Sequence, residues 1–256
     1  MTEKLGKKLN EFTQELEIPL DTDELSKLVP WLHETLPNLA NPYQHYQMPD
    51  GQGGTKGGYE GWSLTSRDGS YTDGWPGNGP RNLSYEQDVE DMSRRVRDLK
   101  VRTPACNPYV HKIIDQLEIL GFKPSKGRVG VLRPGKNIRI HSDAGAQIDH
   151  LYVARVHIPL ITNPDAWFAT YNPPKEYIRT DLGRFCYEPG EFDSELRRKY
   201  ESRIHMEFGK AYFTMVNCLH TAYNEGTTDR YHMMFVVWDT KNLTHFPFNN
   251  QYRIDD

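Results

Sequence analysis

The sequence predicts a mainly β fold with flanking helices, in which two sheets face each other as a jelly roll, also called a double-stranded β-helix. Two observations lead to this prediction. The C-terminal half contains many short β-branched and aromatic runs separated by turn residues, which is typical of a sandwich or barrel. The N-terminal part instead carries apolar residues at helical spacing, so we expect helices that pack against the barrel.

The predicted helices come before the barrel, at residues 5–16, 23–36, 85–99 and 109–120. The first shows apolar residues at spacings of four, three and four, beginning at Leu5. The last has an apolar face that starts at Val110, and Gly121 stands just past its end, as expected of a helix C-cap.

The predicted strands are residues 128–132, 137–141, 152–159, 166–171, 183–187, 204–208, 211–217 and 231–238. We expect residues 126–256 to form the jelly-roll core, and residues 1–125 to supply N-terminal helices and a glycine-rich loop that pack on it. At this length folding buries roughly 70–75% of the surface of the unfolded chain, which suits one structural domain.

The glycine-rich segment, residues 49–80, also carries Trp62, Tyr71 and Trp75. A long loop without periodicity inside a compact domain is usually either functional or disordered. The interleaved aromatic residues argue against a simple linker, and they leave a substrate lid and a surface for a partner protein equally open.

Composition excludes several classes of partner. The chain has 31 Lys and Arg residues against 35 Asp and Glu, a net charge of −4, and no long basic run, which argues against nucleic acid. Its apolar stretches fall far short of the roughly 20 residues that cross a bilayer, and Met1 leads into no apolar signal core. Three distant cysteines form no CxxC pair. We therefore expect a cytoplasmic protein without a membrane partner.

One tripeptide in the C-terminal half carries metal-ligand chemistry. His141 and Asp143 stand two residues apart at the end of a predicted strand, where alternation puts both side chains on one face. His220 follows another predicted strand that antiparallel pairing could bring alongside. Two neutral imidazoles and one carboxylate are the ligands of non-haem Fe(II) oxygenases. We therefore expect these residues to hold Fe(II), although His-x-Asp alone also occurs in surface turns.

Arg230 supports this interpretation, because it stands ten residues after His220 at the start of the last predicted strand. A guanidinium can bind a carboxylate through two parallel hydrogen bonds. The expected partner is the distal carboxylate of 2-oxoglutarate, with the oxo-acid end on the iron and a position left for O₂. The sequence thus indicates Fe(II) as cofactor and 2-oxoglutarate as cosubstrate.

Three segments of the C-terminal half resemble the aspartyl/asparaginyl β-hydroxylase-like 2-oxoglutarate oxygenases, a family that includes bacterial proline hydroxylases. They are residues 129–143 (VGVLRPGKNIRIHSD), 154–164 (ARVHIPLITNP) and 209–239 (GKAYFTMVNCLHTAYNEGTTDRYHMMFVVWD). The resemblance implies a cupin-like jelly roll and a dioxygenase that hydroxylates an unactivated C–H bond. It also implies that Arg155 and His157 help to hold 2-oxoglutarate.

Two positions depart from the family pattern. Members that act on protein domains lack the carboxylate ligand, so Asp143 makes this chain more similar to the amino-acid hydroxylases. Gly130 stands where some relatives carry a hydroxyl that contacts 2-oxoglutarate, so that contact must come from elsewhere. The resemblance therefore favours three protein ligands to iron and a free or modified amino acid as substrate.

The candidate substrate contacts are Trp62, Arg67, Trp75, Arg139 and His150. The first three lie in the glycine-rich segment, where they could close over a bound molecule and exclude water. Arginines beyond Arg230 offer partners for a substrate carboxylate. We therefore expect a small carboxylate-bearing substrate, with residues of a peptide or protein as the open alternative.

Two other classes of protein stay open on the sequence alone. A jelly-roll binding module could hold a sugar or an acid on its inner face and do no chemistry. A cupin-type enzyme could use zinc or nickel with the same ligands. Release of succinate under O₂ would separate these classes from the expected dioxygenase.

Overall fold

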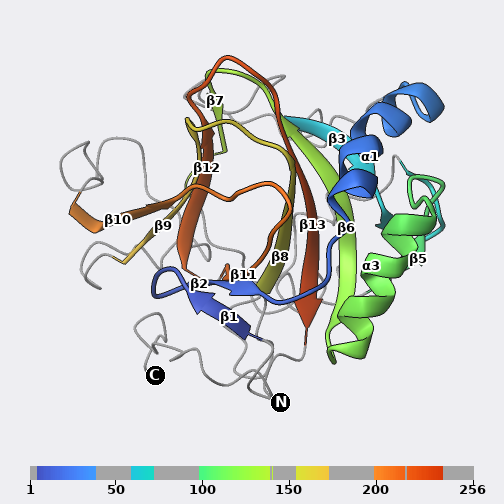
Figure 1. The fold of residues 1–256 in the computed structure, drawn as a ribbon, viewed down its shortest axis with the longest axis horizontal. Helices are drawn as coiled ribbons and strands as arrows, with labels where there is room; N and C mark the ends of the chain where they lie inside the picture. The colour runs from blue at the N-terminus through green and yellow to red at the C-terminus, as the bar shows by residue number, and fades with distance from the viewer. Residues whose placement is uncertain are drawn as a thin grey trace, which may run out of the picture.

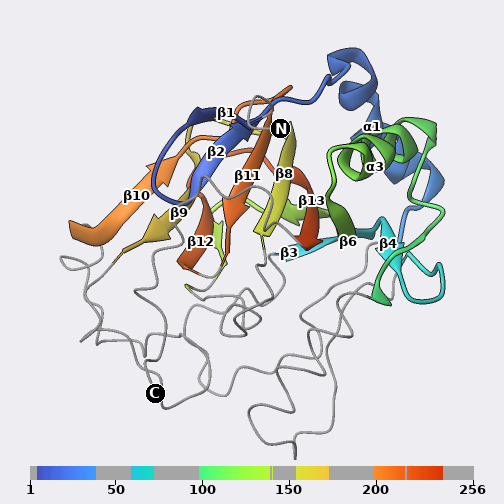
Figure 2. The ribbon, with the colours of Figure 1, turned by 90° about the horizontal axis from the view of Figure 1, so that it is seen from below.

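The structure is a computed structural model that describes residues 5–38, 59–71, 98–138, 140, 154–172, 199–216 and 218–238. This part of the chain contains a seven-stranded and a four-stranded antiparallel sheet, a further pair of strands, and two helices, α1 (Thr22–Thr35) and α3 (Pro108–Ile119). Both helices lie on the larger sheet, α1 against β8 and α3 against β6, away from strands β9 and β10 of the smaller sheet (Figures 1 and 2).

The large sheet has the strand order β1-β2-β11-β8-β13-β6-β3. Its strands are β1 (Leu5–Lys8), β2 (Thr13–Leu16), β3 (Tyr59–Ser63), β6 (Lys123–Leu132), β8 (Ala154–Ile161), β11 (Ala211–Met215) and β13 (Arg230–Trp238). The small sheet has the order β10-β9-β12-β7 and consists of β7 (Lys136–Asn137), β9 (Ala166–Tyr171), β10 (Glu201–Ile204) and β12 (Leu219–Asn224). A separate pair is formed by β4 (Thr65–Ser66) and β5 (Val101–Arg102).

The path of the chain through these strands is that of a jelly roll. From β6 to β13, successive strands pass from one sheet to the other at each connection except that between β9 and β10. The four central strands β11-β8-β13-β6 therefore face the four strands β10-β9-β12-β7 (Figure 1). Eight strands wound in this way form a double-stranded β-helix, which confirms the predicted fold class.

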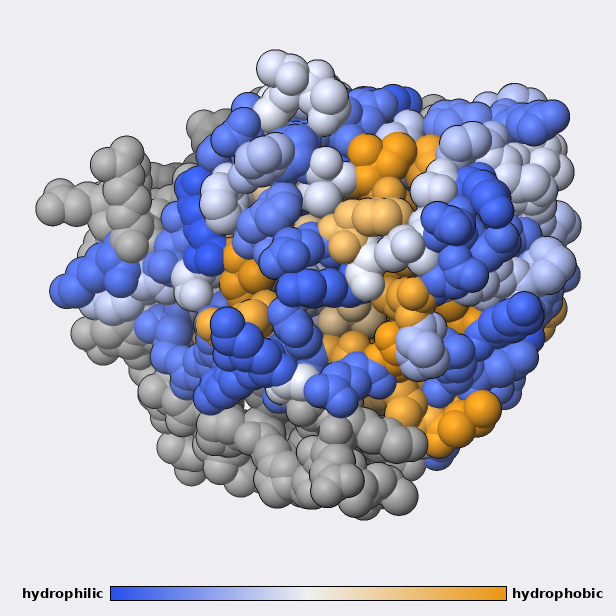
Figure 3. Space-filling model, in the orientation of Figure 1, coloured by the Kyte–Doolittle hydropathy of each residue, from blue (hydrophilic) through white to orange (hydrophobic). Residues whose placement is uncertain are grey.

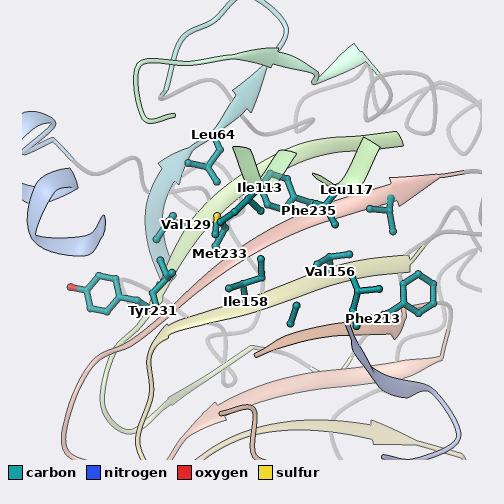
Figure 4. Close-up of a cluster of buried hydrophobic side chains, with 14 of the residues drawn as sticks. Leu64, Ile113, Leu117, Val129, Val156, Ile158, Phe213, Tyr231, Met233 and Phe235 are labelled. Carbon is teal, nitrogen blue, oxygen red and sulfur yellow. The ribbon is translucent and has the colours of Figure 1, made fainter. Parts of the chain in front are cut away.

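The main hydrophobic core lies between the outer face of the large sheet and the helices. Val129, Val156 and Phe235, on three neighbouring strands, point to this face (Figure 4). Ile113 and Leu117 of α3 are part of the same cluster and are fully buried. This packing leaves the opposite face of the large sheet to the interior of the barrel.

Local signals set the helix ends. The Asp21 side chain accepts hydrogen bonds from the backbone N–H groups of Asp23 and Glu24 at 3.0 and 3.1 Å, which caps α1. Asn107 caps α3 in the same way, and Gly121 adopts a φ of +90° just after that helix. The predicted helices at residues 23–36 and 109–120 are confirmed.

The first predicted helix is wrong, because residues 5–16 form the hairpin of β1 and β2. The Asn10 side chain accepts hydrogen bonds from the N–H groups of Phe12 and Thr13, at 2.9 and 2.8 Å, and so fixes a tight turn. Strand β2 then pairs with β11. Pairing with a sheet edge satisfies the backbone and overrides the helical spacing of the apolar residues.

Part of the predicted glycine-rich loop is also a strand, since β3 pairs with β6 along the other edge of the large sheet. Gly61 lies opposite Gly130 in this pair, and a Cβ at position 61 would come within 1.9 Å of the Val129 carbonyl oxygen. Only glycine allows this close approach. The rest of the segment lies outside the described residues except for residues 64–71.

The other predicted strands differ from the observed ones mainly at their ends. Residues 166–171 form a strand as predicted, whereas residues 211–217 end their strand at Met215. Strand β10 ends at Ile204, where the prediction began. The predicted strand at residues 183–187 and nearly all of the predicted helix at residues 85–99 lie outside the described residues. Strand β12 was not predicted.

The face of the molecule seen in Figure 3 is mixed in character. Hydrophobic residues gather across its middle, with hydrophilic residues on both sides. Within the described ranges, no helix has the length and the apolar content needed to cross a membrane.

Candidate functional site

Alternation along β13 identifies the side chains that point into the barrel. Met233 and Phe235 belong to the outer cluster that packs against the helices (Figure 4). Because successive side chains of a strand point to opposite faces, Arg230, His232 and Met234 point inward, toward the small sheet. Two of these three inward residues are polar, which is unusual for a barrel interior and indicates a binding site.

Strands β8 and β6 add further polar groups to the same interior. Val156 lies in the outer cluster, so its neighbours Arg155 and His157 point inward. His157 on β8 and Arg128 on β6 are both in register with Met234 on β13. The inner face of the large sheet therefore carries arginine and histidine on three adjacent strands.

These polar groups are deeply buried, and the charged ones among them are arginines. The buried arginines and histidines of the described residues are Arg128, Arg155, His157, His220, Arg230 and His232, each exposed by 8% or less. The buried residues of the part of the chain that the structure describes include no Asp or Glu. The three arginines give this interior a positive potential, which suits an anionic ligand.

His220 lies on β12, in the small sheet, with its ring inside the barrel. Its Nδ1 is 2.9 Å from the carbonyl oxygen of Cys218, and the Phe168 ring stacks on it at 5.7 Å. A carbonyl only accepts hydrogen bonds, so Nδ1 carries the proton and Nε2 carries the lone pair. That is the tautomer in which a histidine binds a metal through Nε2, with the other nitrogen fixed by a backbone carbonyl.

His157 lies between His220 and His232. Its ring centroid is 5.2 Å from that of Phe168, which stacks on His220, and 6.2 Å from that of His232. Burial, together with the charges of Arg155 and Arg230, holds the pKa of His157 well below its usual value. The ring is therefore neutral near pH 7, and it can donate one hydrogen bond and accept another.

Arg230 is held by a neighbour on its own strand. Its Nη2 donates to Nδ1 of His232 at 3.0 Å, and Arg230 is only 4% exposed. Burial and the charge of Arg230 lower the pKa of His232 well below its usual value, so this ring is also neutral. The arrangement fixes the guanidinium inside the barrel, as a binding site for a carboxylate requires.

Strand β7 brings the chain toward His220. Asn137 is in register with Tyr223, and the Ile138 N–H donates to the Ala222 carbonyl at 2.9 Å, so residues 136–138 run along β12 in the direction of position 220. The described chain reaches Ile140, one residue before His141.

Two of the three predicted iron ligands, His141 and Asp143, lie outside the described residues, as do Trp75, Arg139 and His150. Among the residues that the structure describes, no three metal-ligating side chains gather. The predicted iron site is therefore represented here by His220 alone.

The structure places the other two predicted substrate contacts away from the barrel interior. Trp62 is 1% exposed on the outer face of β3, and its indole N–H donates to the Leu36 carbonyl at 2.7 Å beside the His33 ring. Arg67 is exposed in the turn after β4. Trp62 thus stabilises the contact with α1, because alternation in β3 directs it away from the barrel, and neither residue lies where it could contact a ligand inside the barrel.

Sequence reasoning missed His232 and Arg128 as members of the site. The signal for His232 was present, since it stands two residues after Arg230 on one strand and must share its face. Arg128 could have been placed only with the register of β6 against β13.

No family model matches the chain, and no curated protein matches it. Solved structures show a distant likeness. The non-haem α-ketoglutarate-dependent epimerase SnoN from nogalamycin biosynthesis is 13% identical, with 89% of this chain and 78% of that chain covered and a TM-score of 0.47. A 2OG-Fe(II) oxygenase family oxidoreductase from Burkholderia pseudomallei is 14% identical (88% and 84% covered, TM-score 0.43). HygX from Streptomyces hygroscopicus, with nickel and 2-oxoglutarate bound, is 16% identical (54% and 67% covered, TM-score 0.39).

Proposed function

We propose that this protein is an Fe(II)- and 2-oxoglutarate-dependent dioxygenase that hydroxylates a C–H bond of a small carboxylate-bearing molecule. His141, Asp143 and His220 would hold the iron. Arg230 would bind the distal carboxylate of 2-oxoglutarate, and Arg155 and His157 would contact the same molecule. When bound, the iron and 2-oxoglutarate together supply the chemistry that activates O₂.

One observation carries the proposal: a histidine in the metal-binding tautomer shares a buried interior with three arginines. His220 presents its lone pair at Nε2, while Arg128, Arg155 and Arg230 are each at most 8% exposed. A five-carbon dicarboxylate that bridges from the metal to a guanidinium satisfies both features at once. Neither a neutral sugar nor a metal without an organic anion would use the buried arginines.

The chain's own residues have three tasks in this reaction. The Cys218 carbonyl fixes the tautomer and the orientation of the His220 ring, and Phe168 packs on its face. Arg230, oriented by His232, would set the depth to which the dicarboxylate enters. The burial of these groups inside the barrel would keep water from them, which strengthens each electrostatic contact.

The buried cations of this interior support a substrate class. Arg230 and Arg155 are assigned to 2-oxoglutarate, and Arg128 on β6 is a third arginine that is 8% exposed. A carboxylate on the substrate would suit such a cationic interior, so we favour a free or modified amino acid over a side chain within a protein. Arg133 is only partly buried and forms ion pairs with Glu60 and Asp229 at 2.6 Å.

The test is succinate formation by the full chain with Fe(II), 2-oxoglutarate and O₂, in the presence of free amino acids, acylated amino acids or peptides. We expect succinate release that one small acid stimulates, together with the gain of one oxygen atom on that acid in the mass spectrum. Hydroxylation of peptides alone would overturn the substrate class and leave the reaction intact. Tight binding of 2-oxoglutarate without any succinate would instead indicate a binding module.

A further inference from the structure

The role of His232 goes beyond the residues assigned above, and the argument begins with its position. It is 1% exposed and points into the barrel from the middle of the large sheet. Its cross-strand partners are Gly130 on β6 and Pro159 on β8. Glycine has no side chain, and proline offers no donor on its ring, so His232 is the polar side chain of this cross-strand row.

The hydrogen bond from Arg230 determines which nitrogen of His232 carries the proton. A guanidinium has donors and no acceptor, so the 3.0 Å contact between Nη2 and Nδ1 requires a lone pair on Nδ1. The neutral ring therefore carries its proton on Nε2. This N–H is buried, and no group of the described residues accepts a hydrogen bond from it.

A buried N–H without an acceptor is unfavourable, so one in a cationic interior indicates an oxygen of a bound anion. The residue in register with it on the next strand is Gly130, which contributes no side chain. His157, one cross-strand row further toward His220, has its ring 6.2 Å from that of His232, and both of its ring nitrogens are likewise buried without a described partner. The two neutral imidazoles thus line the same buried interior as Arg230 and His220.

We propose that His232 is a positioning and specificity residue for the cosubstrate: its Nδ1 orients the Arg230 guanidinium, and its Nε2–H donates to the dicarboxylate that Arg230 binds. The inference rests on the proposed function. The same histidine would align the arginine that anchors the cosubstrate. It would also contribute to the preference for an oxo acid that has a second carboxylate. The imidazole can do this while neutral, so it adds a donor without adding a buried charge.

The test compares three substitutions at position 232 that separate the two roles. His232→Phe keeps the ring volume and removes both nitrogens. His232→Gln places its amide near the position of Nε2 and restores a donor there. His232→Asn places its amide oxygen near Nδ1 and so keeps an acceptor for Arg230. His111→Gln is the control, because His111 lies on α3 outside the barrel, where its Nδ1 is 2.8 Å from Nη1 of Arg102.

The readout is the dissociation constant of 2-oxoglutarate, measured by calorimetry on the full chain with Mn(II) in place of Fe(II). We expect His232→Phe to raise it roughly ten- to a hundredfold, the effect of losing a hydrogen bond to a charged group. His232→Gln and His232→Asn should each recover part of the loss, while His111→Gln stays within about threefold of the wild type.

The specificity claim is tested with 2-oxovalerate, which has the same chain length but no distal carboxylate. Its binding should be insensitive to the substitutions at position 232, so the preference for 2-oxoglutarate should shrink. Equal losses of affinity for both acids would mean that His232 has a merely structural role, and would overturn the inference. A dissociation constant of 2-oxoglutarate in His232→Phe equal to that of the wild type would also overturn it. If His232→Phe does not fold, an unchanged dissociation constant in both His232→Gln and His232→Asn would overturn the inference instead. A wild type that binds no 2-oxoglutarate would refute the proposed function as well.

Discussion

Arg230→Lys is the substitution that most directly examines the cosubstrate anchor. Arg230 is buried, and one of its nitrogens is engaged by His232 at 3.0 Å, so its remaining donors are held in one orientation. A lysine keeps the charge but has a single nitrogen, which cannot donate to His232 and also form two parallel bonds to a carboxylate. A hydrogen bond to a charged group contributes roughly 1.5–3 kcal/mol, and about 1.4 kcal/mol corresponds to a factor of ten. We therefore predict that the KM for 2-oxoglutarate rises roughly ten- to a hundredfold.

The assay is the initial rate of succinate formation against 2-oxoglutarate concentration, at saturating Fe(II) and substrate. The matched control is Arg203→Lys, because Arg203 is partly exposed and pairs with Glu201 and Glu225 at 2.9 and 3.2 Å. Surface pairs of this kind contribute little, so the control should keep the wild-type KM. An unchanged KM in Arg230→Lys would refute the reasoning and move the anchor elsewhere, with Arg155 as the first place to look.

Three further predictions concern the metal, the core and pH. His220→Ala or Asp143→Ala should abolish turnover while the circular dichroism spectrum stays native, and full activity in either would remove that residue from the metal site. Trp62→Ala should lower the free energy of unfolding by about 3–5 kcal/mol, because Trp62 belongs to the core. The KM for 2-oxoglutarate should not change. A raised KM at a temperature well below the melting temperature would mean that Trp62 belongs to the binding site. Burial, with Arg155 and Arg230 respectively, holds the pKa of His157 and His232 below the ordinary 6.5, so the unfolded chain takes up protons that the folded chain does not. The free energy of unfolding should therefore fall as the pH drops below about 6.5, by up to about 1.4 kcal/mol per pH unit for each histidine, and an unchanged slope in His232→Gln would contradict this.

Most of the barrel could be predicted because its strands bury one face against helices and so show clear apolar patterns. Strands β8 and β13, close to the predicted residues 152–159 and 231–238, are examples. Strand β12 escaped prediction for the opposite reason. All six of its residues are buried, although His220, Thr221 and Asn224 are polar, so no alternation marks it as a strand.

The candidate site could be predicted where a residue has a characteristic sequence offset, as His220 and Arg230 have. It could not be predicted where membership depends on register. Arg128 lies in the site because β6 pairs with β13 in a register that directs its side chain inward. Trp62 lies outside the site because its position in β3 directs its side chain toward α1. The role of His232 likewise depends on a neighbour, the arginine two residues before it on the same strand.

The glycine-rich segment shows how a tertiary contact can reverse a local signal. Its glycines predict a loop, but Gly61 is required inside a strand, because the Val129 carbonyl leaves no space for a Cβ. The hairpin of β1 and β2 shows the same effect with helical spacing, which pairing with β11 overrides.

The central claim is that iron and 2-oxoglutarate bind together inside this barrel, and an anaerobic titration tests it most directly. Fe(II) chelated by a 2-oxo acid absorbs visible light, whereas Fe(II) bound to histidine and carboxylate alone does not. We predict that the visible band appears when both Fe(II) and 2-oxoglutarate are added to the wild type, saturates at one iron per chain, and is absent in His220→Ala. Absence of the band in the wild type, or its full retention in His220→Ala, would contradict the account.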